Sequence, residues 1–352
     1  MIYILIYCLI YLNALLKGKL NNFTLIVLCL FSGLRFKTGL DYENYDLYFE
    51  SLPKNIWNFE FGFHCLSLVA HFSYVYHYLF FSVIIFLILY LTLKNLSRIE
   101  VSFFLIVFTY YGYWNVFSVL RQSIACVIFF YIVVKFEEIQ KKKKYFLYFI
   151  AFSMHYSALF FILVIEFLIP YISNKRKIQI LLVAASVFFI QFKIDSTMFM
   201  PSPWKYALEI TSLVKEVKFS LRFLEMVLVF SLSFLFARNK FDRTLVAFVS
   251  VQLFFYSFFS SVSFLSERLN VYFDLLYALL FIKLIVMLVL KFKEKKIIQP
   301  IATTFLTIFI AIRYYQYIFQ ADYSEVPEWE ITNEDRFIPY QSIFNENNER
   351  KY

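Results

Sequence analysis

The sequence predicts an all-α polytopic membrane protein with about 10–12 transmembrane helices, among which short re-entrant helices are expected. Of its 352 residues, 61% are hydrophobic, which exceeds the roughly 45–50% of an ordinary globular domain, and the mean hydropathy is +0.66. No regular alternation of polar and apolar residues marks strands, so helices must satisfy the backbone hydrogen bonds in lipid. Four stretches run almost without charge: Phe80–Leu93, Leu221–Phe236, Leu269–Leu290 and Ile297–Ile312.

The N-terminal stretch MIYILIYCLIYLNALLKGKL is mostly apolar. It lacks the positively charged start and the small-residue cleavage site of a secretory signal peptide. We therefore expect a first transmembrane helix that is retained.

Clusters of basic residues recur between the apolar segments, and the positive-inside rule assigns such clusters to the cytoplasmic side. A run of lysines beside a membrane span is typical of an anchor near anionic lipid, so we expect no nucleic-acid partner. The clusters are Lys17 with Lys19, Lys94 with Arg98, Lys135 with Lys141–Lys144, Lys175–Lys177, Arg238 with Lys240 and Arg243, and Lys291–Lys296.

The remaining connections then face outward. They are the loops at about 35–60 and 193–220, the turn at 115–121 and the segment from Asp322 onward. That last segment carries eight acidic and three basic residues, as expected of a segment outside the cytoplasm. We expect one transmembrane domain over residues 1–321 and an acidic extracytoplasmic tail over 322–352.

Two apolar segments are too long for a single simple span. In Phe61–Leu93, a partial helix holding His64, His71 and His77 is expected before the true crossing. The segment between Lys144 and Lys175 is interrupted by SMHYS. It forms either a hairpin of two short helices with His155 near the tip or one long helix. We favour the hairpin, because non-helical backbone at membrane depth is tolerated beside a wet cavity.

Four arginines lie in or beside apolar sequence and, in this topology, toward the outer face: Arg35, Arg121, Arg222 and Arg268. Arginine at such a position is costly and often marks a ligand site, and its guanidinium matches phosphate oxygens. The alternative is that each reaches the interface or pairs with a carboxylate such as Glu225 or Glu267. Arg222 ranks lowest, because Glu225 lies three residues later on the same helix face.

Five short blocks in order, LRFKTGLDYENY, FEFGFHCL, NVFSVLRQSIA, MHYSAL and ERLNVYF, resemble the successive motifs of the EpsG family. That family is similar to the Wzy-type polymerases of bacterial O-antigen and capsular polysaccharide. The resemblance covers about residues 30 to 275. The first block departs from the family pattern, because Thr38 precedes Gly39 and Leu40 is inserted before Asp41.

The resemblance implies an enzyme of the bacterial cytoplasmic membrane with a GT-C-like helical bundle and an active site facing outward. It would transfer a growing glycan from undecaprenyl pyrophosphate to a new lipid-linked repeat unit, for O-antigen, capsule or exopolysaccharide. The implied partners are the lipid-linked donor and acceptor, membrane lipid, a chain-length regulator and a flippase. No cofactor is expected.

A glycosyl pyrophosphate already has a good leaving group, so the protein must stabilise the diphosphate charge and orient or deprotonate the acceptor. The arginines suit the first task, and Asp41, Glu60 and His155 are candidates for the second. Asp41 has a competing role as the salt-bridge partner of Arg35, and His155 as a buried, satisfied histidine. No DxD pair or metal-ligand spacing is present, and the four cysteines are scattered, so we expect metal-independent transfer.

Other predicted substrate contacts flank these groups. Tyr42 and Tyr45, with Tyr48 and Trp57, could stack on sugar rings or belong to an interfacial aromatic belt. Asn115 and Gln122 lie close to Arg121 in the sequence, and Tyr272 lies one helical turn after Arg268.

The alternatives are a flippase or other transporter of lipid-linked oligosaccharide, an O-antigen ligase, and a membrane acyltransferase. A transporter predicts internal repeats and charges spread through the membrane depth, and neither is visible. An acyltransferase needs a histidine with an acidic partner, and His155 has no acidic neighbour in the sequence. A polymerase is therefore favoured.

Overall fold

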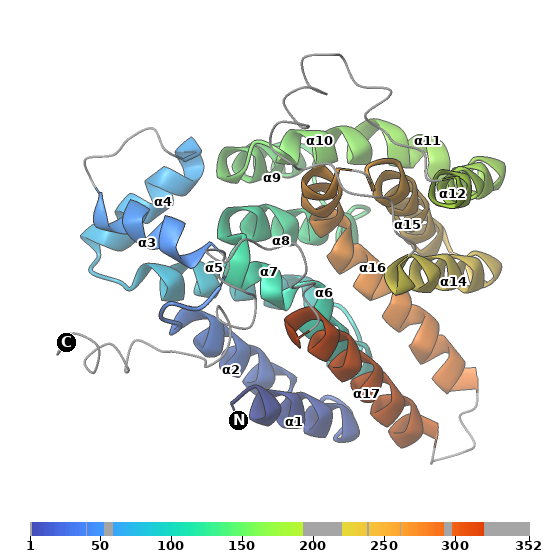
Figure 1. Ribbon diagram of the computed structural model, residues 1–352, viewed down its shortest axis with the longest axis horizontal. Coiled ribbons are helices and arrows are strands. Elements are labelled where there is room, and N and C mark those ends of the chain that lie inside the picture. The colour runs from blue at the N-terminus through green and yellow to red at the C-terminus, as the bar shows by residue number, and fades with distance from the viewer. Residues whose placement is uncertain are drawn as a thin grey trace. The chain divides into compact units, whose positions relative to one another are not determined.

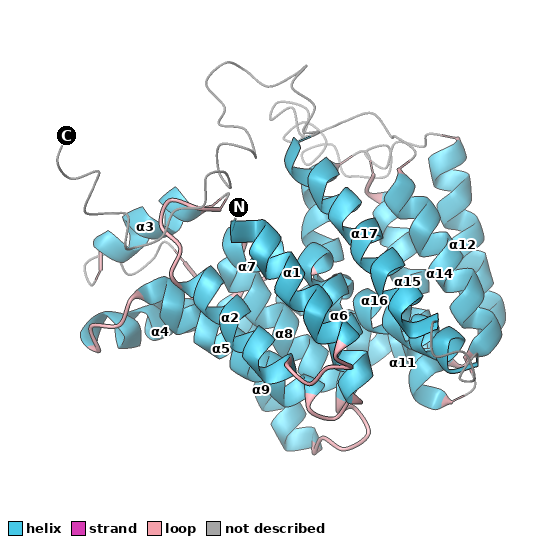
Figure 2. Ribbon diagram, turned by 90° about the horizontal axis from the view of Figure 1, so that it is seen from below, coloured by secondary structure: helices cyan, strands magenta, loops and turns pink. Residues whose placement is uncertain are grey.

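The computed structural model describes residues 2–39, 41–52, 59–192, 220–237, 239–260, 262–291 and 298–319. All regular structure in these ranges is helical (Figures 1 and 2), which confirms the all-α class for the described residues. The expected outer loop at 193–220, apart from Ser220, and the expected tail at 322–352 lie outside them, as does Trp57.

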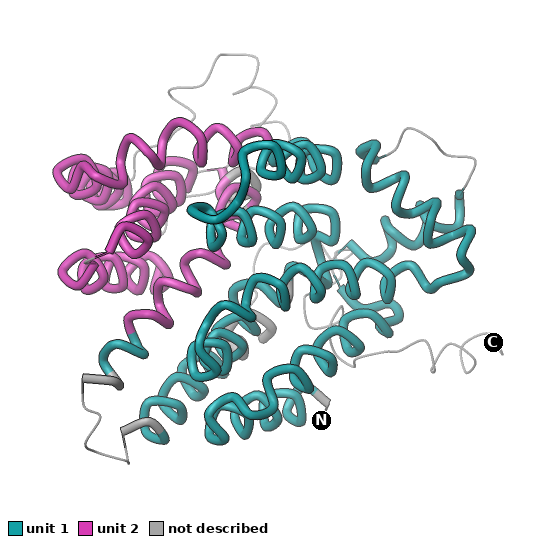
Figure 3. The backbone as a smooth tube through the Cα atoms, turned by 180° about the vertical axis from the view of Figure 1, so that it is seen from behind, with its two compact units in different colours: residues 1–158, 285–352 teal, residues 159–284 magenta. Residues whose placement is uncertain are grey.

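The chain forms two compact units, residues 1–158 with 285–352 and residues 159–284 (Figure 3). In unit 1, α5 packs against α2 and α8, α8 against α9, and α17 against α1 and α6 (Figure 1). Its helices are α1 (Ile2–Leu15), α2 (Asn21–Gly33), α3 (Tyr42–Glu50), α4 (Phe61–Phe72), α5 (His77–Leu93), α6 (Arg98–Tyr111), α7 (Tyr113–Ser118), α8 (Leu120–Val134), α9 (Lys141–Met154) and α17 (Ile298–Phe319).

In unit 2, α15 packs against α11, α12 and α14. Phe161 of α10 stacks on Phe248 of α15 and Tyr272 of α16, so aromatic rings form part of this unit's core. The helical segments are α10 (Ala158–Leu163), a π-helix (Val164–Leu168), α11 (Ile169–Ser173), α12 (Arg176–Gln191), α14 (Leu221–Phe236), α15 (Lys240–Phe258) and α16 (Ser263–Lys291). The first residue of α10 belongs to unit 1, and α16 continues beyond unit 2 at its C-terminal end.

Local signals explain several helix starts. Ser97 and Glu100 form a capping box at the start of α6, in which each side chain bonds the other residue's backbone N–H. Ser220 caps α14 and Asn239 caps α15. In each case the side-chain oxygen accepts a hydrogen bond from the backbone N–H of the residue three positions later.

Few helices are long enough to span a bilayer. The segment Arg268–Leu288 of α16 passes by length and apolar character, and Ala158–Ser173 with Arg176–Gln191 passes only as one broken or re-entrant span, bent by 115°. Other apolar segments form helices of 10–17 residues, such as α5 and α8. The structure thus offers one or two spans among the described residues, and the larger expected number stays a prediction.

The predicted interruptions in the two long segments are present. The first ends at Phe72 and resumes at His77, so His77 begins α5 and does not belong to the partial helix, contrary to our expectation. Tyr74 between them has a φ of 54°, which ends α4 sharply. The second interruption lies between Met154 and Ala158, with His155 in extended conformation.

The first helix is present over Ile2–Leu15, and the chain then turns at Lys17 and Gly18, both with positive φ. Of the four cysteines, Cys29 and Cys126 are buried, Cys65 is half-buried, and Cys8 is exposed.

Candidate functional site

Three predicted site residues meet in unit 1. One carboxylate oxygen of Glu60, Oε2, accepts a hydrogen bond from Nη1 of Arg121. The other, Oε1, lies 2.7 Å from Nδ1 of His155 and also accepts from the backbone N–H of Tyr156 at 3.4 Å. Glu60 is only 4% exposed. The three residues form a buried carboxylate with a cation on one side and an imidazole on the other, which we call the Glu60 cluster.

The ends of three helices bring the Glu60 cluster together. Glu60 is the extended residue just before α4, and Arg121 is the second residue of α8. His155 directly follows α9 in extended conformation, with φ −158° and ψ 121°. The helix interruption that the sequence predicted at SMHYS is therefore the point at which His155 meets Glu60.

The charges in the cluster keep Glu60 ionised. Burial alone would raise the pKa of the carboxyl, but the hydrogen bond with His155 and the charge of Arg121 outweigh it and lower the pKa to about 2. Glu60 is therefore a poor general base at neutral pH. Because an ionised carboxylate only accepts hydrogen bonds, Nδ1 of His155 must donate, which leaves Nε2 of a neutral ring as an acceptor.

Arg121 is fixed by neighbours other than Glu60. Its guanidinium lies 4.1 Å from the ring centroid of Phe59. Its backbone N–H donates to the hydroxyl of Tyr45 at 3.4 Å. Its Nε is buried and has no hydrogen-bond partner among the described residues. A donor of this kind beside a partly exposed guanidinium can bind an anion.

Arg35 lies inside the protein. It is 0% exposed, and its Nη1 donates to the carbonyl of Val116 at 2.7 Å. Its guanidinium lies over the rings of Tyr78 and Phe117, at 4.7 and 5.0 Å from their centroids. Asp41, the expected salt-bridge partner, is not among the contacts described for this guanidinium and lies half-buried just before α3. Nη1 thus fastens two chain segments, whereas Nε and Nη2 of Arg35 are buried without a hydrogen-bond partner among the described residues, so phosphate binding by Arg35 stays a prediction.

Gly39 packs against the same part of α7. Its φ is +115°, and a Cβ atom there would lie 2.3 Å from the carbonyl oxygen of Phe117. Only glycine fits such a position easily. Arg35 and Gly39 therefore both hold the 35–39 loop against Val116 and Phe117 of α7, the short helix that precedes the helix carrying Arg121.

Tyr42 and Tyr45 are each 3% exposed, so their rings are packed in the protein and are not open to a sugar. The ring of Tyr42 stacks on that of Tyr78 with 4.7 Å between their centroids, and the ring centroids of Tyr45 and Phe59 are 5.7 Å apart. Both rings pack against protein in the described arrangement, and sugar stacking by them stays a prediction.

Two further predicted contacts lie on α7 and α8. The amide of Asn115 donates to the carbonyl of Tyr111 at 3.3 Å. Gln122 is 1% exposed and lies in the core beside Arg121.

The other two arginines belong to unit 2. Arg222 of α14 pairs with Asp274 of α16, which also accepts from the amide of Gln252 at 3.0 Å. Arg268 lies half-buried in α16. Whether the four predicted arginines converge on one ligand therefore stays a prediction.

Sequence reasoning missed Asp274 and Tyr277. Tyr277 donates to Glu225 at 2.7 Å, so α14 and α16 are joined by two polar contacts. Asp274 is an acidic residue in a long apolar run, and that signal could have identified it. Tyr272 is 1% exposed and stacked on Phe161.

Within the described part of the chain, no group of three or more histidine, cysteine, aspartate or glutamate side chains could hold a metal ion. The polar chemistry of the Glu60 cluster thus consists of one carboxylate, one guanidinium and one imidazole.

The described residues form apolar helices, one of them long and apolar enough to cross a membrane, and a buried charged cluster at helix ends, which are the features expected of a helical membrane protein. The model of the EpsG family matches residues 18–342, so the chain belongs to the EpsG family, which is linked to exopolysaccharide biosynthesis. This confirms the family resemblance of the sequence motifs. No curated protein and no solved structure matches the chain.

Proposed function

We propose that this protein polymerises oligosaccharide repeat units carried on undecaprenyl pyrophosphate, at the outer face of the bacterial cytoplasmic membrane. The single observation that carries the proposal is the Glu60 cluster, in which a guanidinium and an imidazole share one buried carboxylate. Family membership supports a role in polysaccharide biosynthesis. The lipid-linked donor and acceptor are the substrates, and a flippase and a chain-length regulator are the expected partners.

In the proposed reaction, the acceptor hydroxyl oxygen bonds to the anomeric carbon of the donor sugar. The bond from that carbon to the pyrophosphate oxygen breaks, and undecaprenyl pyrophosphate leaves with the electron pair. The hydroxyl proton passes to Nε2 of His155, while Arg121 stabilises the charge that develops on the pyrophosphate. Glu60 orients the imidazole and balances the charge it gains.

Arg35 and Gly39 are positioning residues in this proposal, because they contact the segment before Arg121 and not the Glu60 cluster itself. Asp41 holds the outer loop in this scheme; the alternative is that Asp41, in place of His155, deprotonates the acceptor. Binding of the pyrophosphate by Arg268 and Arg222 is part of the proposal, and it rests on the sequence alone. The transfer needs no metal ion in this scheme.

The test is polymerisation by purified protein in liposomes with a synthetic lipid-linked repeat unit and a chelator. Wild-type protein should extend the glycan under these conditions, and loss of activity on chelation would contradict the metal-free scheme. Asp41→Asn should retain partial activity at every pH if Asp41 only holds the loop, because Asn still accepts a hydrogen bond. A collapse of activity would make Asp41 the base.

One observation favours a second candidate, acyl transfer to a surface glycan. His155 has no acidic neighbour in the sequence, but the fold places Glu60 beside it, so His155 has the acidic partner that an acyltransferase needs. Deleting the gene in its host separates the candidates. Single repeat units on lipid without a polymer ladder support the polymerase. A normal ladder that lacks acyl groups supports the acyltransferase, and the absence of outward-facing units supports a flippase.

A further inference from the structure

A second charged region lies at the ends of α8 and α9 that are far from the Glu60 cluster, and it extends to the α1–α2 turn and to the connection between α5 and α6. Arg121 is the second residue of α8 and Lys135 is its C-cap, and the 14 residue steps between them rise about 21 Å. Basic residues from three loops, all predicted to be cytoplasmic, line two neighbouring cavities at this end of unit 1. The gathering of these loops agrees with the topology that the positive-inside rule predicts.

The first cavity has a volume of about 420 Å³ and lies between the α1–α2 turn, the end of α5 and the start of α6. Lys19, Lys94 and Arg98 line it, and no acidic residue does. None of these three side chains has a hydrogen bond or ion pair to a described residue. The carboxylate of the nearby Glu100 is already used to cap α6. Three cations without a carboxylate favour an anionic ligand.

The polar end of this cavity is firmly built. A Cβ atom at Gly18 would lie 2.2 Å from the carbonyl oxygen of Arg98, so the turn packs closely on α6. The amide of Asn21 donates to that carbonyl at 3.0 Å, and fully buried Asn13 donates to Asn21 at 2.8 Å. The backbone at this end of the cavity is therefore held in place, and it presents the exposed side chains of Lys19, Lys94 and Arg98.

Apart from Asn22, the rest of the lining is mainly apolar and includes Leu25, Tyr90 and Leu93. A cavity with cations at one end and apolar side chains at the other matches a phosphate headgroup joined to an acyl chain. A soluble phosphate shares the headgroup chemistry but would leave the apolar part unfilled.

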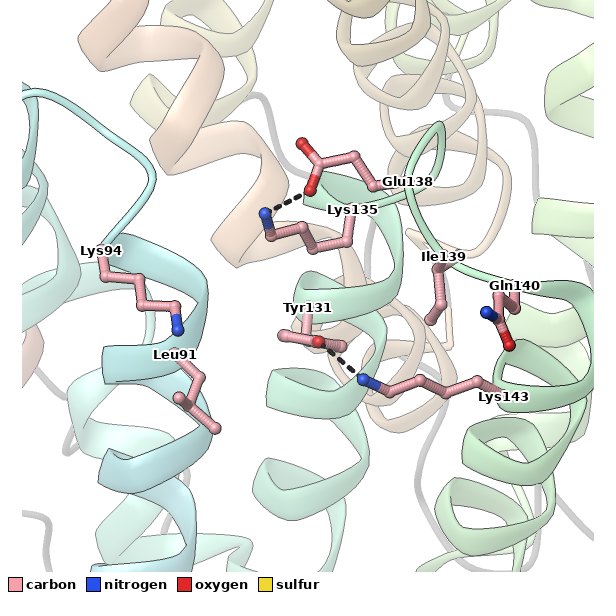
Figure 4. Close-up of a pocket in the computed structure, with 8 residues that line it drawn as sticks. All are labelled: Leu91, Lys94, Tyr131, Lys135, Glu138, Ile139, Gln140 and Lys143. Carbon is pink, nitrogen blue, oxygen red and sulfur yellow. Dashed lines mark hydrogen bonds and ion pairs between the residues drawn. The ribbon is translucent and has the colours of Figure 1, made fainter.

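The second cavity, of about 430 Å³, shares Lys94 with the first and lies between α5, α8 and α9 (Figure 4). Lys143 donates to the hydroxyl of Tyr131 at 3.2 Å, and Lys135 pairs with Glu138, whose side chain is 70% exposed. The basic lining thus continues around Lys94 and widens the region that attracts an anionic headgroup.

We infer that these two cavities form a binding site for an anionic phospholipid on the cytoplasmic side of the protein, with Lys94 at its centre. The site is separate from the Glu60 cluster and does not depend on the polymerase proposal. Bound lipid would join α1, α2, α5 and α6 and so stabilise unit 1.

The test measures phosphatidylglycerol binding to the purified full-length protein by native mass spectrometry and by the rise in unfolding temperature over phosphatidylcholine alone. The double variant Lys94→Gln with Arg98→Gln should bind phosphatidylglycerol about 30-fold more weakly. Each basic group near the membrane surface contributes about 1 kcal/mol to the attraction of anionic lipid, and a loss of about 2 kcal/mol corresponds to this factor. Lys141→Gln with Lys142→Gln is the matched control, since these exposed lysines carry the same charge and line neither cavity. The control should bind as the wild type does.

An equal loss of phosphatidylglycerol binding in both double variants would contradict a defined site and would show only diffuse attraction of anionic lipid to the basic surface. An equal stabilisation by inorganic phosphate or pyrophosphate would overturn the lipid assignment. Folding of each variant is checked by its unfolding temperature in phosphatidylcholine alone. If the Lys94 and Arg98 variant fails to fold, Lys19→Gln removes one exposed cavity charge and should still weaken binding, and wild-type binding by it would contradict the inference.

Discussion

Replacing Gly39 by alanine should disable the Glu60 cluster from a distance. The new Cβ atom would lie 2.3 Å from the carbonyl oxygen of Phe117, whereas a carbon–oxygen contact needs about 3.3 Å. The loop or α7 must therefore move by about 1 Å. Phe117 lies four residues before Arg121, and a displacement of about 1 Å at a catalytic group can lower a rate about 100-fold. The positive φ adds a strain of about 1–3 kcal/mol.

The assay compares initial rates of glycan extension in liposomes, per folded protein, with unfolding temperatures of the same preparations. Ile310→Val is the control, because Ile310 is fully buried in α17, and this change costs about 1 kcal/mol without touching the 35–39 loop. Gly39→Ala should lose about 100-fold in rate, and Ile310→Val should keep its rate. Similar small rate losses in the two variants would refute the positioning role of the loop.

Three further predictions concern the charged groups. Arg121→Ala should abolish polymer in the host at unchanged protein level, and Arg121→Lys should recover little because a lysine cannot reproduce the planar guanidinium fork; a normal ladder in Arg121→Ala would contradict this. If Arg121 and Arg268 share one pyrophosphate, the double alanine variant should be no worse than either single variant, whereas additive losses would assign them to separate subsites. Because the pKa of Glu60 is lowered to about 2, its ionised form should stabilise the fold fully above about pH 4.5 and progressively less down to pH 2. The difference in unfolding temperature between wild type and Glu60→Gln should therefore stay constant from neutral pH to about pH 5 and shrink below it; a difference that shrinks near pH 7 would show that Glu60 titrates there.

The sequence allowed prediction of single residues and helix interruptions but not of their partners. The polar SMHYS segment stands out in an apolar run, so the break at His155 was predictable. The pairing of Glu60 with Arg121 and His155 joins residues 61 and 95 positions apart, and no local pattern encodes it. Asp41 was expected to pair with Arg35 because the two are close in sequence.

The fold instead places Arg35 against Val116, 81 positions away. Burial decides such cases, because a fully enclosed guanidinium must find its contacts inside the core, whichever segment supplies them. The same holds for Tyr42 and Tyr45, whose aromatic character suited either sugar stacking or packing, and which the fold uses for packing.

The most direct test of the account is the initial rate of glycan extension by purified wild type, His155→Gln and Glu60→Gln in liposomes with a synthetic lipid-linked repeat unit. If His155 accepts the proton and Glu60 orients it, each variant should lose about 100- to 10,000-fold in rate, and the double variant should be no slower than His155→Gln alone. Wild-type rates in His155→Gln would contradict the central claim that the Glu60 cluster carries out the transfer.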